Sequence, residues 1–222
     1  MSAELWKKVD TYLEGVLVRE DDVFTAALRD SENAGLPSIA VSPSQGKLLG
    51  LLVQSLGARQ VLELGTLGGY SSLWLARALP EGGKLTTLEL EPKHAEVARK
   101  NLERGGVAGR VQIRVGPASA SLTSLKSEGA GPFDLIFIDA DKESLAEYFT
   151  KSLALARVGT LIVVDNVIRR GDVANPESTD PRVLGVRKLN DAIAAEPRVS
   201  ATAIQTVGAK GYDGLTFALV IR

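Results

Sequence analysis

The chain has 222 residues, of which 45% are hydrophobic and 24% charged, a composition typical of a globular protein with one sizeable core. Its formal net charge is -1 and no segment concentrates Lys and Arg, so we expect no nucleic-acid partner. There is no cysteine and only one histidine, which excludes thiolate catalysis and Cys-ligated zinc and disfavours a multi-histidine site. A bound metal should therefore be a hard cation with oxygen ligands.

The beginning of the chain is predicted to contain two helices. Apolar residues recur at helical spacing over 5–16. A second helix is expected over 43–57, because Ser42 can cap it and Pro43 suits its first turn. The polar segment 33–43 between them is predicted to be a loop. No apolar run is long enough for a membrane span or a secretory signal, so we expect a cytoplasmic protein without a membrane partner.

From residue 59 onward, short apolar runs alternate with helical patterns. The predicted strands cover 61–64, 84–90, 111–115, 133–139 and 160–165, and the predicted helices cover 71–79, 92–104, 122–126, 145–155 and 183–195. Runs such as LIFI and LIVV are almost entirely apolar, which is typical of parallel strands covered on both faces. The last two runs, 199–205 and 215–221, have too short a link for a parallel crossover, so we expect an antiparallel hairpin.

These patterns predict one α/β domain over residues 1–222, built on a doubly wound, mostly parallel sheet with an antiparallel edge. Residues 58–222 would form its core. The helices of residues 1–57 are expected to form a substrate lid or a dimer surface. In such a sheet, ligands bind beyond the carboxyl ends of the strands.

A glycine-rich loop, residues 63–71, leaves the first strand and enters a helix. Its glycines, Gly65, Gly68 and Gly69, allow a tight turn or the close approach of a ligand. The loop departs from the dinucleotide pattern G-x-G-x-x-G because residue 67 is Leu, which weakens the case for a nicotinamide cofactor. The glycines alone are weak evidence for any ligand.

Two further features strengthen the case for a nucleoside cofactor. Glu89 ends the second strand about 20 residues after the glycine loop, where a carboxylate can accept both hydroxyls of a ribose. The alternatives are an exposed glutamate beside a turn, or a role for the adjacent Glu91. After the third strand, Ala118 and Ser119 could border an adenine ring or form an ordinary turn and helix cap.

Acidic and amide side chains end two neighbouring apolar strands. Asp139 ends the fourth strand, Asp165 ends the fifth, and Asn166 follows it. They offer two carboxylates and one amide oxygen at the same edge of the sheet, which suits an octahedral Mg²⁺ with room for waters and substrate. Asp and Asn also begin loops for reasons of their own. Two acids at one edge, with Lys142 close by, nevertheless favour a cation.

In this order, the segments VLELGTLGGYS, LELEP, FIDADK and VVDNV resemble the metal-dependent O-methyltransferases typified by catechol and caffeoyl-coenzyme A O-methyltransferases, most of all their small bacterial members. The similarity runs from about Ser42 to the end of the chain. It implies a seven-stranded Rossmann-like sheet, S-adenosylmethionine as cofactor and a bound divalent metal, Mg²⁺ with Ca²⁺ or Mn²⁺ as alternatives. It also implies a homodimer and a small aromatic acceptor with vicinal hydroxyls.

The resemblance also implies roles for particular residues. Lys142 would be the general base, the alternative being a surface lysine that neutralises Asp141. The metal ligands would be Asp139, Asp165 and Asn166. The cofactor-binding residues would be Glu63, Gly65, Thr66, Gly69, Tyr70, Ser71, Glu89, Leu90, Ala118, Ser119 and Asp139.

Other residues and readings stay open at this point. No residue matches the late glutamate with which catechol O-methyltransferase holds the second hydroxyl; Tyr212 and Asp213 are candidates. Tyr70 could cover the cofactor or pack in the core, and His94 is expected in a solvated position. The alternative functions are a metal-independent methyltransferase of another acceptor class, an NAD-dependent dehydrogenase and a non-catalytic cofactor-binding module.

Overall fold

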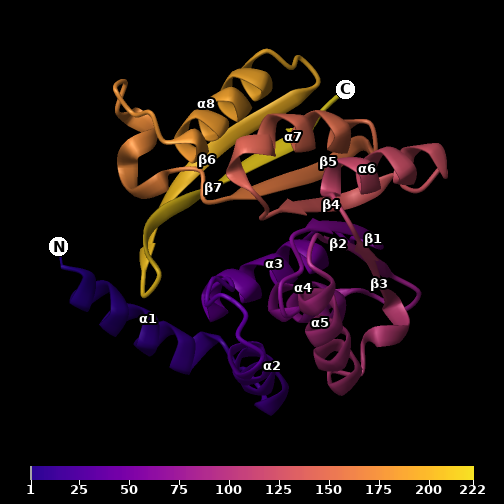
Figure 1. The fold of residues 1–222 in the computed structure, drawn as a ribbon, viewed down its shortest axis with the longest axis vertical. Helices are drawn as coiled ribbons and strands as arrows, with labels where there is room; N and C mark the ends of the chain where they lie inside the picture. Colours follow the sequence, from indigo (N-terminus) through magenta and orange to yellow (C-terminus); the bar gives the residue numbers. More distant parts are fainter. Residues whose placement is uncertain (1) are drawn as a thin grey trace.

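The computed structural model describes residues 2–222, which contain one seven-stranded sheet of order β3-β2-β1-β4-β5-β7-β6 (Figure 1). The strands are β1 Gln60–Leu64, β2 Lys84–Glu89, β3 Val111–Val115, β4 Phe133–Ile138, β5 Ala156–Asp165, β6 Val199–Gly208 and β7 Gly211–Val220. All neighbours up to β5 pair in parallel, whereas β7 is antiparallel to both β5 and β6. The predicted fold, a mostly parallel Rossmann-like sheet with an antiparallel hairpin, is confirmed.

Helices cover both faces of this sheet (Figure 1). They are α1 Ala3–Leu17, α2 Asp22–Asn33, α3 Pro43–Ser55, α4 Tyr70–Ala78, α5 Pro92–Arg104, α6 Ala118–Ser127, α7 Leu145–Leu153 and α8 Pro181–Ala194, with short 3₁₀ turns at η1 Ala108–Arg110, η2 Lys142–Ser144 and η3 Arg169–Ala174. One apolar core lies between the sheet and α2 to α5, and the other lies between the sheet and α6 to α8. The strands are therefore desolvated on both faces, and polar residues at their ends meet at one rim.

The predicted helix after Ser42 is confirmed, with a reciprocal capping box. The Gln45 N–H donates to Ser42 Oγ over 3.2 Å, and the Ser42 N–H donates to Gln45 Oε1 over 3.1 Å. The helix α2 was not predicted, because its sequence DVFTAALRDSEN is largely polar and only Phe24, Ala26 and Ala27 are buried in it. Tertiary packing stabilises it instead: the Phe24 ring stacks on Trp74 with a centroid distance of 4.2 Å.

Several boundaries differ from the sequence prediction. Helix α6 begins at Ala118, directly after Pro117, rather than at residue 122. Strand β5 begins at Ala156, because a register shift lets residue 156 pair with Phe133. The hairpin strands extend to Gly208 and from Gly211, so the glycine-containing segment read as a link is mostly paired strand.

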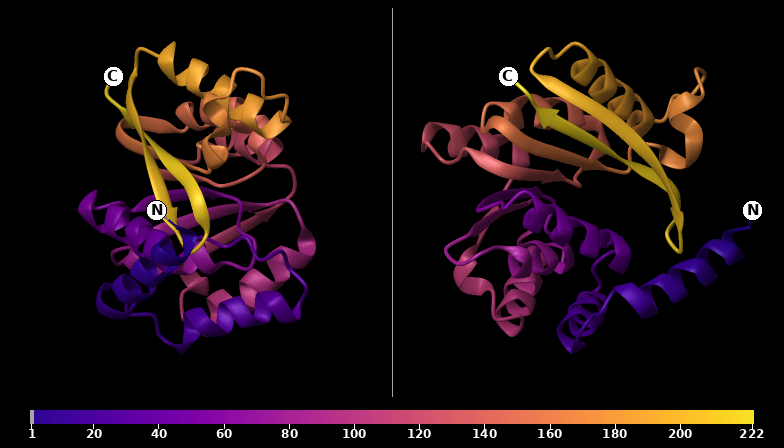
Figure 2. Two further views of the ribbon diagram at one scale, coloured as in Figure 1. Left: turned by 90° about the vertical axis from the view of Figure 1, so that its left-hand side faces the viewer. Right: turned by 180° about the vertical axis from the view of Figure 1, so that it is seen from behind.

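The hairpin of β6 and β7 curves away from the sheet and reaches α1 (Figure 2). At its tip, the Ala209 N–H donates to Asp10 Oδ2 over 2.6 Å. No residue of α1 is buried, so this helix lies against the molecule rather than in its core. None of the helices within residues 2–222 combines the length and apolar character needed to cross a membrane.

Candidate active site

The loop after β1 and the end of β4 touch at the carboxyl rim of the sheet. The Gly65 N–H donates to Leu88 O and the Asp139 N–H donates to Leu64 O, each over 2.9 Å, so the parallel pairing continues into the loops. Gly65 has φ +96°, and a Cβ there would lie 2.0 Å from the carbonyl oxygen of Asp139. Glycine is required at residue 65 for both reasons, and the glycine loop is held directly beside the acidic strand end.

Glu63 lies beneath this loop and is fully buried. Its carboxylate accepts hydrogen bonds from Ser71 Oγ over 2.6 Å, from Ser72 Oγ and from Thr87 Oγ1 over 2.7 Å. Burial raises the pKa of Glu63 to about 7, although the three hydroxyl donors act to lower it. Glu63 thus joins β1, β2 and the start of α4 under the predicted cofactor site.

Glu89 binds the glycine loop through its side chain. Its Oε2 accepts the N–H groups of Thr66 over 3.1 Å and Leu67 over 2.8 Å, and its Oε1 accepts the Glu91 N–H over 2.9 Å. His94 Nδ1 lies 3.3 Å from the same Oε1. The expected solvated position for His94 holds only in part: its side chain is 21% exposed, and the imidazole lies against the carboxylate predicted to bind ribose.

The other predicted cofactor residues are placed in different ways. Tyr70 is buried, packs edge-on against Phe24 and donates its hydroxyl to Glu20, so its side chain serves packing. Ser119 Oγ donates to Glu147 Oε1 over 2.5 Å, which ties α6 to α7. Leu90 is 60% exposed at the edge of the rim. Gly69 begins α4 with φ +82°, and a Cβ there would press on Ala98.

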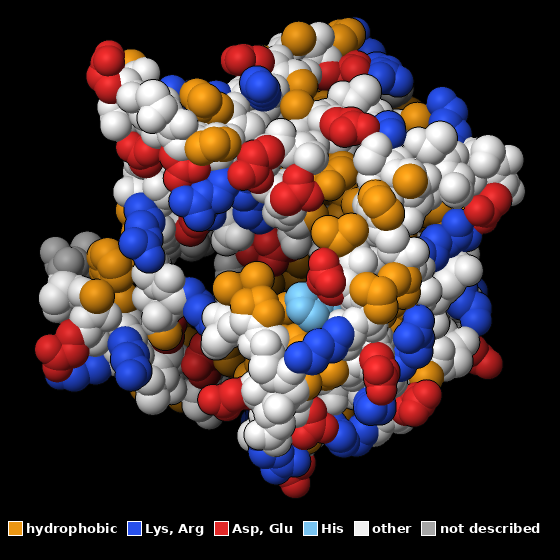
Figure 3. Space-filling model, in the orientation of Figure 1, with side chains coloured by type: hydrophobic (Ala, Val, Ile, Leu, Met, Phe, Trp, Pro, Cys, Tyr) orange, Lys and Arg blue, Asp and Glu red, His pale blue; other side chains and the backbone are white. Residues whose placement is uncertain are grey.

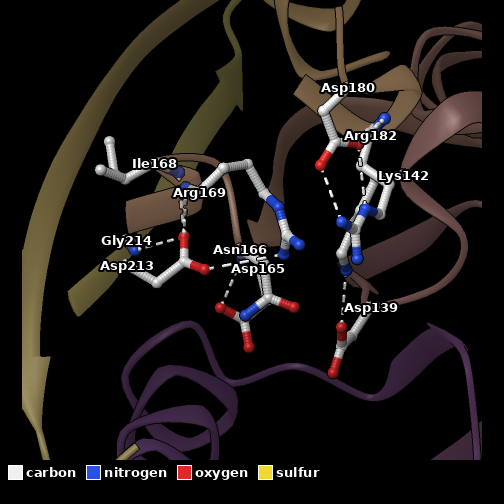
Figure 4. Close-up of polar contacts among 10 residues, drawn as sticks. All are labelled: Asp139, Lys142, Asp165, Asn166, Ile168, Arg169, Asp180, Arg182, Asp213 and Gly214. Atoms are coloured by element: carbon white, nitrogen blue, oxygen red, sulfur yellow. Dashed lines mark hydrogen bonds and ion pairs between the residues drawn. The ribbon is translucent and has the colours of Figure 1, made fainter. Parts of the chain in front are cut away.

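Lys142 is buried beside the metal-ligand candidates. Its Nζ donates to Asp139 Oδ1 over 2.8 Å. Asp141 is engaged elsewhere, because its Oδ1 accepts the Tyr148 hydroxyl over 2.5 Å. The alternative of a surface lysine that neutralises Asp141 is therefore wrong, and the ammonium lies beside Asp139 (Figure 4).

Asp165 is almost completely buried at the end of β5, with Asn166 next to it. Asp165 Oδ1 accepts the Asn166 N–H over 2.6 Å, and Asn166 has the left-handed φ of +61°. An apolar cavity of about 10 Å³ borders the carboxyl and is lined by residues such as Val41 and Leu49. Burial, followed by the nearby charge of Asp139, raises the pKa of Asp165.

These side chains fit a hard divalent cation. Within residues 2–222, no group of three or more His, Cys, Asp or Glu side chains is arranged to hold a metal, so a site here would rest on two carboxylates and the Asn166 amide. Mg²⁺ is commonly held by few carboxylates, with waters or substrate completing its shell. The pKa of Asp165 is raised first by burial and then by the charge of Asp139, and a cation bound at this edge would favour the ionised carboxylate.

Of the two late candidates, the structure brings only Asp213 to the rim. Its Oδ1 accepts the N–H groups of Ile168 over 2.9 Å and Arg169 over 3.0 Å, and its charge also raises the pKa of Asp165. Tyr212 instead donates to Gln205 on the hairpin. Sequence reasoning missed Arg169, which reaches the same rim; its only signal was its position just after the VVDNV segment.

The glycine loop, Glu89 and the acidic strand ends, on a sheet of this order, define a Rossmann-like α/β protein with a nucleoside-type cofactor site at the carboxyl rim of its sheet. Comparison with known proteins identifies the class as the S-adenosylmethionine-dependent O-methyltransferases. A catechol O-methyltransferase of Niastella koreensis is 52% identical over 220 residues, covering 99% of this chain and all of that protein. One from Mycobacterium tuberculosis is 52% identical over 212 residues, covering 96% and 94%.

Solved structures give the same result. An O-methyltransferase from Bacillus cereus in complex with S-adenosylhomocysteine superposes with a TM-score of 0.97 at 52% identity, covering 99% of this chain and 100% of the other. The O-methyltransferase TomG from Streptomyces achromogenes, in complex with S-adenosylmethionine, has a TM-score of 0.96 at 48% identity, with both chains fully covered. The O-methyltransferase family profile matches residues 18–221, and the chain belongs to this family. The dehydrogenase reading is thereby set aside.

Proposed function

We propose that this enzyme methylates one hydroxyl of a catechol-like acceptor and requires a divalent cation, most simply Mg²⁺, to do so. The proposal rests on one observation: Asp139, Asp165 and Asn166 lie at the same edge of the sheet, where β4 and β5 end. The buried Lys142 donates a hydrogen bond to Asp139. The names of the two catechol O-methyltransferase relatives support the same acceptor class.

The predicted ligands are Asp139, Asp165 and Asn166. A divalent cation would supply a positive charge that favours ionisation of an acceptor hydroxyl and orients two adjacent oxygens. S-adenosylmethionine supplies an electrophilic methyl group on a sulfonium. Glu63 and the loop from Gly65 to Ser71 would lie near its methionine part, Glu89 would bind the ribose, and Ala118 and Ser119 would border the adenine.

Lys142 would act as the neutral amine: the lone pair of its Nζ would take the proton from the acceptor hydroxyl, and the side chain would become the ammonium as the acceptor oxygen becomes anionic. Its Nζ is fixed by Asp139 Oδ1 at 2.8 Å and shielded from bulk water, so it is positioned for proton transfer at the acidic edge. The rim would hold the hydroxyl oxygen in line with the methyl group, and such orientation contributes much of the acceleration in a two-substrate reaction.

The test is methylation of catechol with labelled S-adenosylmethionine, before and after treatment with a chelator. We expect the chelator to abolish turnover and added Mg²⁺ to restore it. If treated protein methylates catechol as fast as the Mg²⁺-supplemented enzyme, the metal requirement is wrong and a metal-independent reaction replaces it. If no vicinal dihydroxy aromatic is methylated under either condition, the acceptor class is wrong.

We also propose that the chain forms a homodimer through α1. This helix exposes an apolar face whose members are Leu5, Val9, Tyr12, Leu13, Val16 and Leu17. Mass measurement by light scattering should give twice 23.5 kDa, and Val16→Glu should halve it, whereas Lys7→Glu on the same helix should not. A monomeric parent protein would contradict the proposal. The cytoplasmic location stays a prediction, which cell fractionation would test.

A further inference from the structure

Arg169 projects over the candidate metal edge from the loop that follows β5. Figure 4 shows its guanidinium above Asp165 and Asn166, with Asp213 on one side and Lys142 on the other. The Arg169 side chain is 22% exposed, so it is partly covered by the protein but still accessible to a ligand from solvent. In the orientation of Figure 1, Lys and Arg side chains gather along the upper edge of a hollow in the molecule (Figure 3).

The hydrogen-bonding capacity of Arg169 is poorly used within residues 2–222. A guanidinium has five N–H donors. Its Nε is buried without a partner. Its ion pair with Asp213 joins Nη1 to Oδ2 over 3.8 Å, which is longer than a hydrogen bond. Leaving a buried donor without an acceptor costs free energy, so the guanidinium of Arg169 is available to bind an acceptor that the chain does not provide.

The neighbouring cations are engaged. Lys142 Nζ donates to Asp139 over 2.8 Å, and Arg182 donates to Asp180 through Nε over 3.0 Å and through Nη2 over 2.7 Å. Arg169 is thus the cation of Figure 4 whose side chain is not hydrogen-bonded to a carboxylate. Asp213 cannot easily move closer, because its other oxygen accepts backbone N–H groups from Ile168, Arg169 and Gly214.

The backbone that carries Arg169 is in an unfavourable conformation. Asn166, Arg169 and Arg170 all have positive φ, at +61°, +51° and +58°. Side chains with a Cβ rarely adopt this region, and such strain is concentrated at functional sites. The loop is held there by Asp213 and by close packing on β7, where a Cβ at Gly214 would lie 2.4 Å from Ile168 Cγ1. The fold therefore fixes the direction of this one side chain.

We infer that Arg169 is a specificity-determining residue that binds a carboxylate on the acceptor, so the preferred substrates are catechols carrying an acidic substituent. The inference rests on the proposed function, because it assumes that the catechol oxygens lie at Asp165 and Asn166. A planar guanidinium pairs with a carboxylate through two parallel hydrogen bonds, and the two Nη groups of Arg169, neither of which is hydrogen-bonded to a carboxylate, can supply them.

The experiment compares 3,4-dihydroxybenzoate with 3,4-dihydroxybenzamide, which has the same shape without the charge. Binding is measured by calorimetry with Mg²⁺ and S-adenosylhomocysteine present, and kcat/KM is measured with S-adenosylmethionine. The variants are Arg169→Gln, Arg169→Lys and, as matched control, Arg170→Gln. Arg170 is the next residue, has the same left-handed backbone and is exposed.

We expect the parent enzyme to prefer the acid over the amide by roughly 10- to 100-fold in both measurements, the scale of hydrogen bonds to a charged group. Arg169→Gln should remove this preference while its kcat/KM for the amide changes less than about threefold. Arg169→Lys should keep part of the preference, and Arg170→Gln all of it.

Equal binding of acid and amide by the parent enzyme would overturn the inference. So would a loss in Arg169→Gln that is the same for both compounds, since that result means a general packing role. If neither these compounds nor catechol is methylated, yet the acid still binds more tightly through Arg169, then the proposed reaction fails and the carboxylate site stands.

Discussion

The backbone of Gly185 in α8 lies against the carbonyl oxygen of Lys142. A Cβ at residue 185 would be 2.1 Å from that oxygen and 2.8 Å from Glu143 Cα, both shorter than real Cβ contacts allow. Glycine within a helix ordinarily weakens it by about 1 kcal/mol relative to alanine. The glycine here permits the close approach that sets the position of Lys142 over the acidic edge.

Gly185→Ala should therefore displace Lys142 and its 3₁₀ turn. We expect catechol turnover to fall at least about tenfold, with a loss of roughly 1–3 kcal/mol in the free energy of unfolding from overpacking. Gly15→Ala is the control, because Gly15 also lies in a helix and has nothing within 4 Å of its Cβ position. That control should keep full activity and gain stability. Parent-like activity in Gly185→Ala would refute the positioning role.

Lys142→Ala should lower kcat by about 100-fold or more, the usual effect of losing a group that transfers a proton. The KM for S-adenosylmethionine should change little, because Lys142 bonds to Asp139 and not to the glycine loop. Steady-state kinetics with catechol and saturating Mg²⁺ measures both quantities. Lys126→Ala, at an exposed position of α6, is the control. A decrease of less than threefold in kcat would remove Lys142 from the reaction.

Asp165→Asn should make the metal-free protein more stable and the enzyme inactive. The substitution removes a charge that is disfavoured first by burial and then by the charge of Asp139, so the melting temperature in chelator should rise by a few degrees. Mg²⁺ should raise the melting temperature of the parent protein and leave that of the variant unchanged. A variant that is less stable in chelator, or that is still stabilised by Mg²⁺, would argue against a metal ligand at residue 165.

Glu63 should make stability depend on pH. Burial raises its pKa from the usual 4.5 to about 7 in the folded protein, so the folded state binds the proton more tightly than the unfolded state. Stability is then greatest below pH 4.5 and declines as pH rises to about 7, by roughly 3 kcal/mol at most.

Glu63→Gln has no titrating group at residue 63, so its free energy of unfolding should not show the part of the decrease with rising pH that Glu63 causes. Urea unfolding of the cofactor-free parent and variant between pH 5 and 8 gives the difference. The exposed Glu81→Gln should behave like the parent protein. Parallel stability curves for the parent and Glu63→Gln would show that Glu63 is ionised equally easily in both states.

Much of this fold could be read from the sequence because parallel strands here are almost purely apolar and end in polar residues. That pattern predicted β4 and β5 and the meeting of Asp139 with Asp165. The helix α2 was not predicted because it is stabilised by the Phe24 ring stacked on Trp74, a contact between residues far apart in the chain. Local periodicity carries no record of such a partner.

The same limit applies to the site. The sequence indicated which loops converge, but not that His94 would lie 3.3 Å from Glu89 or that Lys142 would pair with Asp139 instead of Asp141. Arg169 was missed because the direction of its side chain depends on left-handed backbone and on Asp213, 44 residues further along the chain. Such directions follow from tertiary packing, which residue spacing does not encode.

Strand β5 lies between one strand that precedes it in the chain and one that follows it. One of its neighbours, β4, precedes it in the chain, but the other is β7, where Leu215 pairs with Asp165. The glycine loop follows β1 and Glu89 ends β2, and the partners of these strands, β3 and β4, also precede β5 in the chain, so these four strands are synthesised first. The half that carries Asp165 has an open edge until the last strand emerges. The strand edge beside Asp165 can therefore be covered only once β7, the last strand within residues 2–222, is available.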